Sequence, residues 1–168
     1  MLRYRIQLTR DDNDTFLVDV PDVPEAHTFG ETQEEAKTHA VDAILTIFDA
    51  YIKDKRDIPA PSPIRRGQIS IEIPPLDVAK IGLYNAMRDA GIGKYQLAKT
   101  LGWHLPQLDR VLRLRYRSRF DQVQQALEAV GKRVVISVED RNTATDTQVA
   151  TVAGKVRRTR RKALAATG

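Results

Sequence analysis

The pair Pro74–Pro75 separates two segments with different hydrophobic periods, and this change restricts the possible fold more than any other feature of the chain. Before the prolines, apolar residues alternate with polar ones in several short runs, as they do in half-buried strands. After the prolines, apolar residues recur at helical spacing as far as about Val130. The sequence therefore predicts an α+β protein with a strand-containing first domain, residues 1–75, and a helical second domain, residues 76–140.

The first domain is predicted to have the order β-β-β-α-β. Apolar side chains alternate in residues 2–8 and 16–20, and the composition of Asp11–Asp14 between them is that of a turn, so the two runs predict a hairpin. A third short strand is expected over residues 26–29. The last strand is predicted where Ile69, Ile71 and Ile73 alternate with polar residues, with all three isoleucines facing inward.

One helix is predicted between the third and the fourth strand. Thr32 and Glu35 have the spacing of a capping box, and the apolar stripe that follows them should end near Lys55. Three prolines within residues 57–66 then predict an extended connector. One helix packed on one face of a small sheet makes a complete two-layer domain.

The strongest functional motif lies in the second domain. A helix over residues 94–101 carries the small residue Ala98, Gly102 supplies a turn, and a second helix should run from about Leu105 to Leu114. This is the pattern of a helix-turn-helix, whose second helix enters the major groove of DNA. An ordinary helical hairpin with a solvated basic face is the alternative interpretation.

The polar residues around this motif are the candidate DNA contacts. Glutamine and arginine can form paired hydrogen bonds with base edges, and backbone amides at a helix N-terminus favour a phosphate. The candidates are Gln107, Asp109, Arg110 and Arg113 on the second helix, Lys94, Tyr95 and Gln96 at the start of the first helix, and Arg115, Arg117 and Arg119 in the basic run after the second helix.

The second domain is predicted to close with a helix and a short strand. Ser118 and Asp121 resemble a capping box before that helix, and Asp77 is expected to cap the first helix of the domain. The strand, residues 133–138, has no obvious partner in a helical domain, so we expect it to pair with a second copy of the chain in a homodimer or tetramer.

The last 28 residues, 141–168, have almost no bulky apolar side chain and are interpreted as a disordered basic tail. The tail contains Lys155–Lys162, a compact basic run that could hold phosphates.

Charge is distributed unevenly along the chain. Residues 1–75 carry 9 basic and 14 acidic residues, residues 76–140 carry 11 and 7, and residues 141–168 carry 7 and 1. An acidic domain suits a basic partner, whereas a basic domain suits phosphates. The sequence therefore indicates two different partners.

Both domains resemble one family. Residues 94–138, including Leu105–Arg110 and Val123–Ser137, look like the helix-turn-helix of the HicB-type antitoxins found in HicA/HicB type II toxin–antitoxin systems. Residues 1–73 resemble the N-terminal domain of the same family, in particular through Pro21–Pro24 and Gly30–Ala36. The resemblance covers about 140 of the 168 residues, and the two domains come in the same order.

The resemblance implies a partial RNase H-like N-terminal domain that binds a HicA-type toxin, a small basic ribonuclease that cleaves mRNA. It also implies that the antitoxin covers the active surface of the toxin and that the complex binds operator double-stranded DNA and represses its own operon. An acidic domain would speed association with a basic toxin. The candidate toxin contacts are loop acids, which in most proteins are simply solvated: Asp11, Asp12, Asp14, Asp22, Glu25 and Glu31.

Catalysis, a metal site and a cofactor are not expected. Two-metal phosphodiester cleavage needs several converging carboxylates, and only Asp19 and Glu72 lie on predicted strands. His27, His39 and His104 share no ligand spacing, the chain has no cysteine, and no glycine-rich phosphate loop is present.

No apolar run approaches the roughly 20 residues that span a bilayer, and the first residues do not form the apolar block of a signal peptide. A cytoplasmic protein with no membrane partner is therefore expected.

Two other functions remain open at this point. One is a repressor whose N-terminal domain senses a small molecule or a different protein, and the other is a nuclease that uses DNA binding for targeting.

Overall fold

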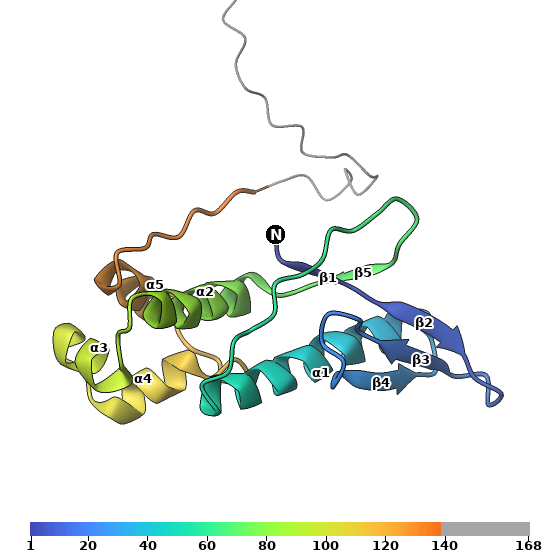
Figure 1. The fold of residues 1–168 in the computed structure, drawn as a ribbon, viewed down its shortest axis with the longest axis horizontal. Coiled ribbons are helices and arrows are strands. Elements are labelled where there is room, and N and C mark those ends of the chain that lie inside the picture. The colour runs from blue at the N-terminus through green and yellow to red at the C-terminus, as the bar shows by residue number, and fades with distance from the viewer. Residues whose placement is uncertain (139–168) are drawn as a thin grey trace, which may run out of the picture. The chain divides into compact units, whose positions relative to one another are not determined.

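The computed structural model describes residues 1–138 (Figure 1). Met1–Val135 form one compact unit, and a second unit begins at Ile136. The predicted domains 1–75 and 76–140 both lie largely within the first unit, and the boundary between them stays a prediction. The predicted basic tail, residues 141–168, lies outside the described residues.

The described residues alternate between short strands and helices of very different lengths. The strands are β1 (Arg3–Arg5), β2 (Gln7–Arg10), β3 (Phe16–Asp19), β4 (His27–Gly30) and β5 (Ser70–Glu72). The helices are α1 (Gln33–Lys53), α2 (Pro75–Asp89), α3 (Lys94–Leu101), α4 (Leu105–Leu112) and α5 (Phe120–Ala129). The predicted order β-β-β-α-β followed by helices is therefore observed, with the first predicted strand divided into β1 and β2.

The strands form two antiparallel sheets that share one stretch of chain. β1 pairs with β5, and β2, β3 and β4 are paired in that order. Ile6, between β1 and β2, continues the first ladder because its N–H donates to the carbonyl of Ile69 at 3.0 Å. The predicted hairpin turn is confirmed, since Asp14 adopts a left-handed backbone with a φ of 62° between β2 and β3.

Helix α1 packs on the strands through a side rich in alanine and aliphatic residues. Thr32 is its N-cap, with the hydroxyl oxygen accepting from the N–H of Glu35 at 3.2 Å, as the capping box predicts. The Glu35 carboxylate accepts from the N–H of Glu31, one residue earlier than the usual partner. The end of β4 lies close to the first turn of α1 at Gly30, where an added Cβ atom would lie 2.4 Å from the backbone nitrogen of Ala36.

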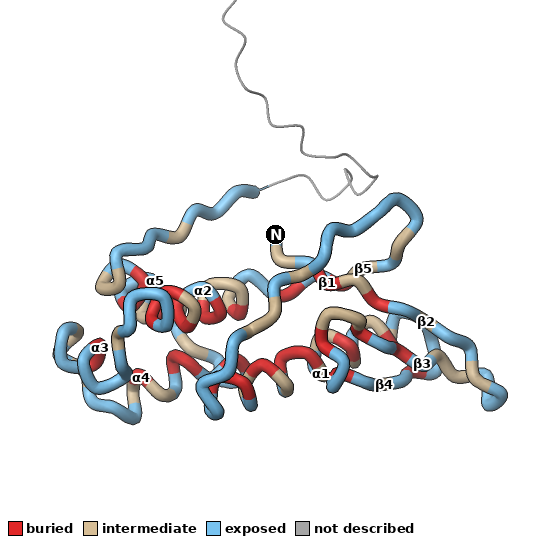
Figure 2. Tube along the Cα trace, in the orientation of Figure 1, coloured by how far each residue is buried: buried red, intermediate tan, exposed pale blue. Residues whose placement is uncertain are grey.

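One hydrophobic core continues from the strands into the helices (Figure 2). Tyr4 and Phe48 meet edge to face, with ring centroids 5.6 Å apart, and both are almost completely buried. The same cluster includes Leu83 of α2, Leu108 of α4 and Val123 of α5. Burial of this apolar surface is the main stabilising contribution.

Several sequence predictions about the ends of elements are wrong. Asp77 does not cap α2, which begins at Pro75, and lies buried in the first turn instead. The hydroxyl of Ser118 donates to the carbonyl of Arg110, so it does not cap α5, whose N-cap is Arg119. Ile69 is 38% exposed, whereas Ile71 and Ile73 face inward as predicted.

The predicted strand over residues 133–138 is also not formed in this single chain. A strand needs a neighbour to satisfy its backbone groups, and no described residue pairs with these ones. Val135 and Ile136 are 78% and 67% exposed.

The close contact of β4 with α1 can be tested with two glycine variants. Gly30→Ala should destabilise the protein by about 1–3 kcal/mol, because its Cβ meets backbone that cannot rotate away. Gly82→Ala should stabilise it by about 0.5–1 kcal/mol, because Gly82 lies in α2 with open space around its Cβ position. Urea unfolding measures both, and equal effects would contradict the tight fit at Gly30.

Candidate nucleic-acid and partner interfaces

Helices α3 and α4 are joined by a sharp turn. Gly102 ends α3 in the left-handed region with a φ of 66°, and the N–H of Trp103 donates to the carbonyl of Ala98 at 2.9 Å. Leu97 and Ala98 of α3 are buried, as is Leu108 of α4. Helices α3 and α4 contact each other, and their role as a DNA-binding helix-turn-helix stays a prediction.

The predicted DNA contacts lie on α3, on α4 and on the chain after α4. Gln107 and Asp109 are half-buried, and the other eight are exposed: Lys94, Tyr95, Gln96, Arg110, Arg113, Arg115, Arg117 and Arg119. Two of them are paired with acids. Lys94 and Asp109 join α3 to α4 at 2.7 Å, and Arg119 binds Asp121 through two nitrogens.

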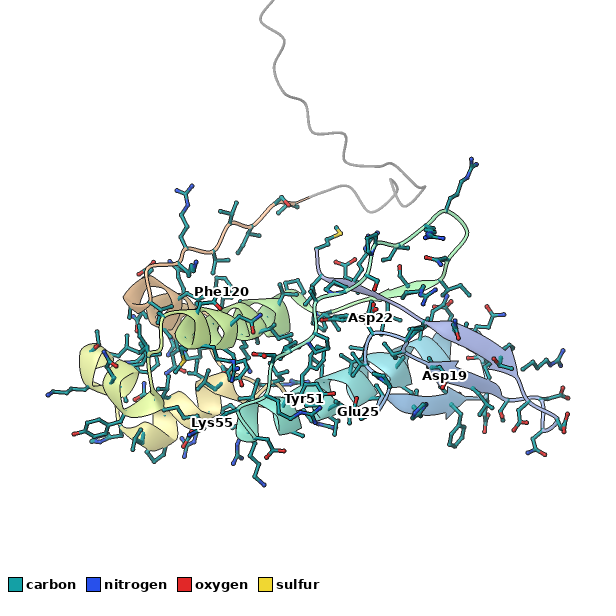
Figure 3. The ribbon with its side chains drawn as sticks, viewed as in Figure 1. Asp19, Asp22, Glu25, Tyr51, Lys55 and Phe120 are labelled. Atoms are coloured by element: carbon teal, nitrogen blue, oxygen red, sulfur yellow. The ribbon has the colours of Figure 1, made fainter. Side chains whose placement is uncertain are left out.

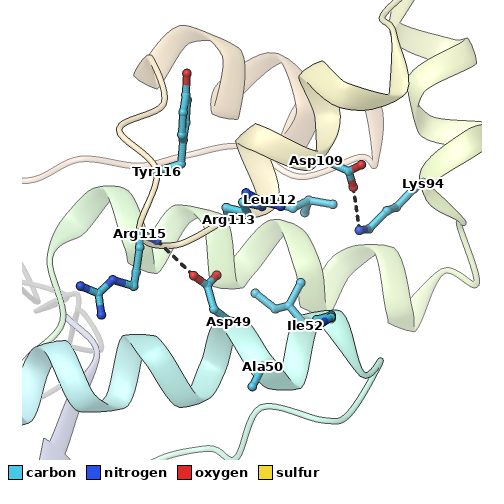
Figure 4. A pocket seen from close by; sticks show the side chains of 10 residues that line it. Asp49, Ala50, Ile52, Lys94, Asp109, Leu112, Arg113, Arg115 and Tyr116 are labelled. Atoms are coloured by element: carbon cyan, nitrogen blue, oxygen red, sulfur yellow. Dashed lines mark hydrogen bonds and ion pairs between the residues drawn. The ribbon is translucent and has the colours of Figure 1, made fainter.

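The α4 residues fall on two sides of the helix. Asp109 of α4 and Arg113, the residue directly after α4, both line a pocket that α1 closes from below in Figure 4. Gln107 and Arg110 do not line this pocket. The pocket has a volume of about 590 Å³, and α1 contributes Asp49, Ala50, Ile52 and Lys53 to its wall.

Asp49 holds the chain that follows α4. Its carboxylate accepts from the N–H of Leu114 at 2.7 Å and from the N–H of Arg115 at 3.4 Å. The guanidinium of Arg115 donates to the hydroxyl oxygen of Thr46, one turn earlier on α1, at 2.7 Å. Residues 113–116, called the post-α4 loop below, are therefore bonded to α1.

Lys80 holds the same loop from the opposite side. Its side chain is completely buried in α2, and its ammonium donates to the carbonyl of Arg113 at 2.7 Å and to that of Tyr116. Burial lowers the pKa of Lys80, while Asp77 and Asp49 oppose this effect by favouring the charged form. Burial likewise raises the pKa of Asp77.

Four of the predicted toxin contacts gather at one end of the three-stranded sheet. Arg10 pairs with Phe16 and Phe16 with Gly30 in the strand register, so the β2–β3 turn and the residue after β4 lie at the same end. The acids there are Asp11, Asp12, Asp14 and Glu31. Asp14 is paired with Arg10 at 2.7 Å.

The other two predicted toxin contacts lie after β3, away from that end, and are engaged within the chain (Figure 3). Asp22 accepts from the N–H and the hydroxyl of Ser62, at 2.9 and 2.6 Å, and so ties the loop after β3 to the proline-rich connector. A hydrogen bond with Tyr51 and the neighbouring Arg56 lower the pKa of Glu25. Burial, with the charge of Asp22 adding to it, raises the pKa of Tyr4 to about 12.

The outer face of the three-stranded sheet carries an exposed apolar pair that sequence analysis did not single out. Leu17 and Phe29 are directly opposite each other on β3 and β4 and are 40% and 59% exposed. Asp19 and His27, two residues along on the same face, form a pair at 2.7 Å. The alternation of inward and outward positions within Phe16–Asp19 and His27–Gly30 could have identified this pair in the sequence, because Leu17 and Phe29 occupy outward positions.

The two carboxylates considered for nuclease chemistry do not meet. Asp19 of β3 is paired with His27 of β4. Glu72 lies on β5 of the other sheet and contacts Arg3 at 3.4 Å. Within residues 1–138, no group of three His, Cys, Asp or Glu side chains is placed to hold a metal ion. In the same part of the chain, no helix combines the length and the apolar character needed to cross a membrane.

The Glu25–Tyr51 contact should make stability depend on pH. Because the folded pKa of Glu25 lies below its unfolded value of 4.5, its stabilising contribution is complete above pH 4.5 and is lost as pH falls through the folded pKa. Glu25→Gln should therefore lower Tm at pH 7, and the difference from the unchanged protein should shrink toward pH 3. Tyr51→Phe, which removes the main donor, should weaken this pH dependence. A Tm difference that is constant from pH 7 to pH 3 would contradict the contact.

Comparison with known proteins gives consistent matches to one family. A family model described as the HicB-like antitoxin of bacterial toxin–antitoxin systems matches residues 3–82. Antitoxin HicB of Pseudomonas fluorescens (strain Pf0-1) is 33% identical over 140 residues, which is 83% of this chain and 95% of the relative. Antitoxin HicB of Escherichia coli (strain K12) is 37% identical over 131 residues, 78% of this chain and 95% of the relative.

One solved structure is also similar, the crystal structure of the N-terminal domain of Burkholderia pseudomallei antitoxin HicB. It is 23% identical, has a TM-score of 0.38, and the match covers 43% of this chain and 98% of that one. The family assignment depends on the sequence matches, which extend well beyond the N-terminal half. The chain belongs to the HicB-like antitoxin family of bacterial toxin–antitoxin systems.

Proposed function

We propose that this protein is a cytoplasmic antitoxin without catalytic activity, which binds and neutralises a small HicA-type toxin and represses its own operon. The observation that carries this proposal is the 33–37% identity, over 78–83% of the chain, to proteins named Antitoxin HicB. In this proposal the strands and α1 form the toxin-binding part, for which a partial RNase H-like fold remains our expectation, and α3 and α4 form the helix-turn-helix.

The toxin is proposed to bind the outer face and the acidic end of the three-stranded sheet. The exposed pair Leu17 and Phe29 supplies apolar surface, and the acids Asp11, Asp12, Asp14 and Glu31 border it at one end. An apolar centre with a charged rim is the usual composition of a protein interface. The acids would attract a basic toxin, in agreement with 14 acidic and 9 basic residues in positions 1–75.

Asp22 and Glu25 have a different role in this proposal. Their carboxylates are already bonded to Ser62, Tyr51 and Arg56, so releasing them for a partner would cost those contacts. We therefore assign them to shaping the loop between β3 and β4, and the toxin contacts to the other four acids.

The antitoxin function is tested by expressing the small reading frame adjacent to this gene, with and without the protein, and recording growth and co-purification. Phe29→Ala should weaken toxin binding at least tenfold, because a large exposed aromatic residue at an interface centre contributes strongly, and should weaken rescue. Tyr95→Ala, an exposed aromatic residue on α3, is the matched control and should bind toxin normally. No growth arrest and no complex would overturn the antitoxin function and favour a repressor with another ligand.

DNA binding is proposed to use α4 as the reading helix. Gln107 and Arg110 are proposed to read base edges, since they do not line the pocket that α4 shares with α1. The remaining candidates are proposed to position the protein on phosphates or to flank the reading helix: Lys94, Tyr95, Gln96, Asp109, Arg113, Arg115, Arg117 and Arg119. Pairing of residues 133–138 with a second copy, which would cover Val135 and Ile136, is proposed to give the homodimer or tetramer that binds two half-sites.

The reading role is tested with two arginine variants. Arg110→Ala should lose about 1–3 kcal/mol on operator DNA and discriminate less between operator and scrambled DNA. Arg117→Ala should weaken binding to both DNAs alike and reduce the slope of log affinity against log salt by about 1. Fluorescence anisotropy over a range of salt concentrations separates the two, and equal losses on both DNAs for Arg110→Ala would assign Arg110 to the phosphates.

A further inference from the structure

The carboxyl end of α1 lies against one flank of the proposed reading helix. Asp49, Ala50, Ile52 and Lys53 share the pocket with Lys94 of α3, Asp109 of α4, and Arg113 and Arg115 of the post-α4 loop (Figure 4). Four candidate DNA contacts therefore line a pocket together with a helix of the same chain. Gln107 and Arg110, on the other side of α4, do not line this pocket.

A helix in the major groove needs both flanks free. The groove is about 12 Å wide and a helix with its side chains is about 10–12 Å across, so a reading helix almost fills it. The carboxyl end of α1 forms a wall of the pocket that Asp109 and Arg113 also line, so a DNA backbone that approaches this flank meets α1. In this arrangement, α4 cannot enter a groove to its full depth on the side of Asp109 and Arg113.

Asp49 also occupies a small anion site. Two successive backbone N–H groups, those of Leu114 and Arg115, point at its carboxylate. Backbone N–H groups also donate to phosphate oxygens in protein–DNA complexes, so the same two donors, with the Arg115 side chain beside them, suit a phosphate oxygen. Here the anion comes from α1, and the Arg115 guanidinium is bonded to Thr46 of the same helix.

Lys80 would keep the post-α4 loop attached to α2 if the contact of this loop with α1 were broken. Its ammonium holds the carbonyls of Arg113 and Tyr116 from α2, so the post-α4 loop has a second anchor, whose charge both Asp77 of α2 and Asp49 of α1 favour. Separation of α1 would free the two N–H groups and the Arg115 guanidinium, while the loop stays attached to the helices that bind DNA.

We propose that the carboxyl end of α1 competes with DNA within the chain, with the Asp49 carboxylate in the position of a backbone phosphate. This inference depends on the proposed DNA binding and adds its regulation. An event that draws α1 away from the post-α4 loop strengthens DNA binding, and an event that holds α1 in place weakens it. Because α1 also packs on β3, β4 and β5, it connects the proposed toxin-binding sheet to this contact.

The first test changes one carboxylate. Asp49→Asn keeps the shape of the side chain but removes its charge, and it should bind operator DNA roughly fivefold to tenfold more tightly, within the range of ordinary coupling between sites. Asp42→Asn removes one charge from an exposed position two turns earlier on α1 and should change affinity by less than twofold. A purely structural role for Asp49 predicts the opposite result, because a loosened loop binds DNA more weakly. Unchanged or weaker binding by a folded Asp49→Asn protein therefore overturns the proposal.

The second test locks the contact in one molecule. The chain has no cysteine, so Ala50→Cys and Tyr116→Cys place two unique thiols on opposite walls of the pocket. Joining them with a reducible bifunctional thiol reagent should weaken operator binding at least tenfold, and reduction should restore it. Full affinity in the linked state overturns the proposal.

The two proposals fail in different ways. If neither the unchanged protein, nor Asp49→Asn, nor the reduced double variant binds operator DNA, the proposed DNA binding itself is wrong. If all of them bind and the linked protein binds equally well, DNA binding stands and the competition by α1 is wrong.

Discussion

The buried ammonium of Lys80 is the interaction on which the arrangement of the helices depends. A charged group without exposure is tolerated only when hydrogen bonds and opposite charges compensate it. The carbonyls of Arg113 and Tyr116 supply the hydrogen bonds, and Asp77 and Asp49 supply the charges. The lysine thus fixes the chain between α4 and α5, and thereby the direction in which the proposed reading helix leaves the core.

Polar contacts also connect the end of α1 to α2. The Tyr84 hydroxyl donates to the carbonyl of Arg56 at 2.7 Å, and Arg88 donates to the carbonyl of Lys55 and pairs with Asp57 at 2.5 Å. Together with the hydrogen bonds of Asp49, they form a group of polar contacts between α1, the residues that follow it and the helical part of the chain. The Arg88–Asp57 pair is largely exposed and exchanges with water at little net cost, whereas the Tyr84–Arg56 and Leu114–Asp49 bonds are partly buried.

Local patterns in the sequence predicted the local structure well. The Asp11–Asp14 turn, the Thr32 cap and Gly102 depend on residues within a few positions of each other, and all three are observed. The failures concern helix ends. The Ser118 hydroxyl donates to the Arg110 carbonyl instead of capping α5, and α2 begins at Pro75, before Asp77, which is buried in its first turn.

The candidate site was predictable only where exposed residues follow a helical period. Arg110 is exposed and Gln107 is half-buried, and their role in reading DNA stays a prediction, whereas the cover by α1 depends on a contact between residues 65 positions apart. Asp49 looks like one more charge on an amphipathic helix, and Lys80 like an exposed lysine. Nothing in the spacing of either residue predicts a bond to the post-α4 loop.

The most direct measurement of this account is hydrogen exchange at the backbone amides of Leu114 and Arg115, followed by NMR in the free protein and after addition of operator DNA. The account predicts slow exchange of the Leu114 amide in the free protein, because its N–H donates to Asp49 at 2.7 Å. It also predicts that Asp49→Asn exchanges this amide faster while the amides of α2 keep their protection. A Leu114 amide that exchanges in the free protein as fast as in an unstructured peptide would contradict the account.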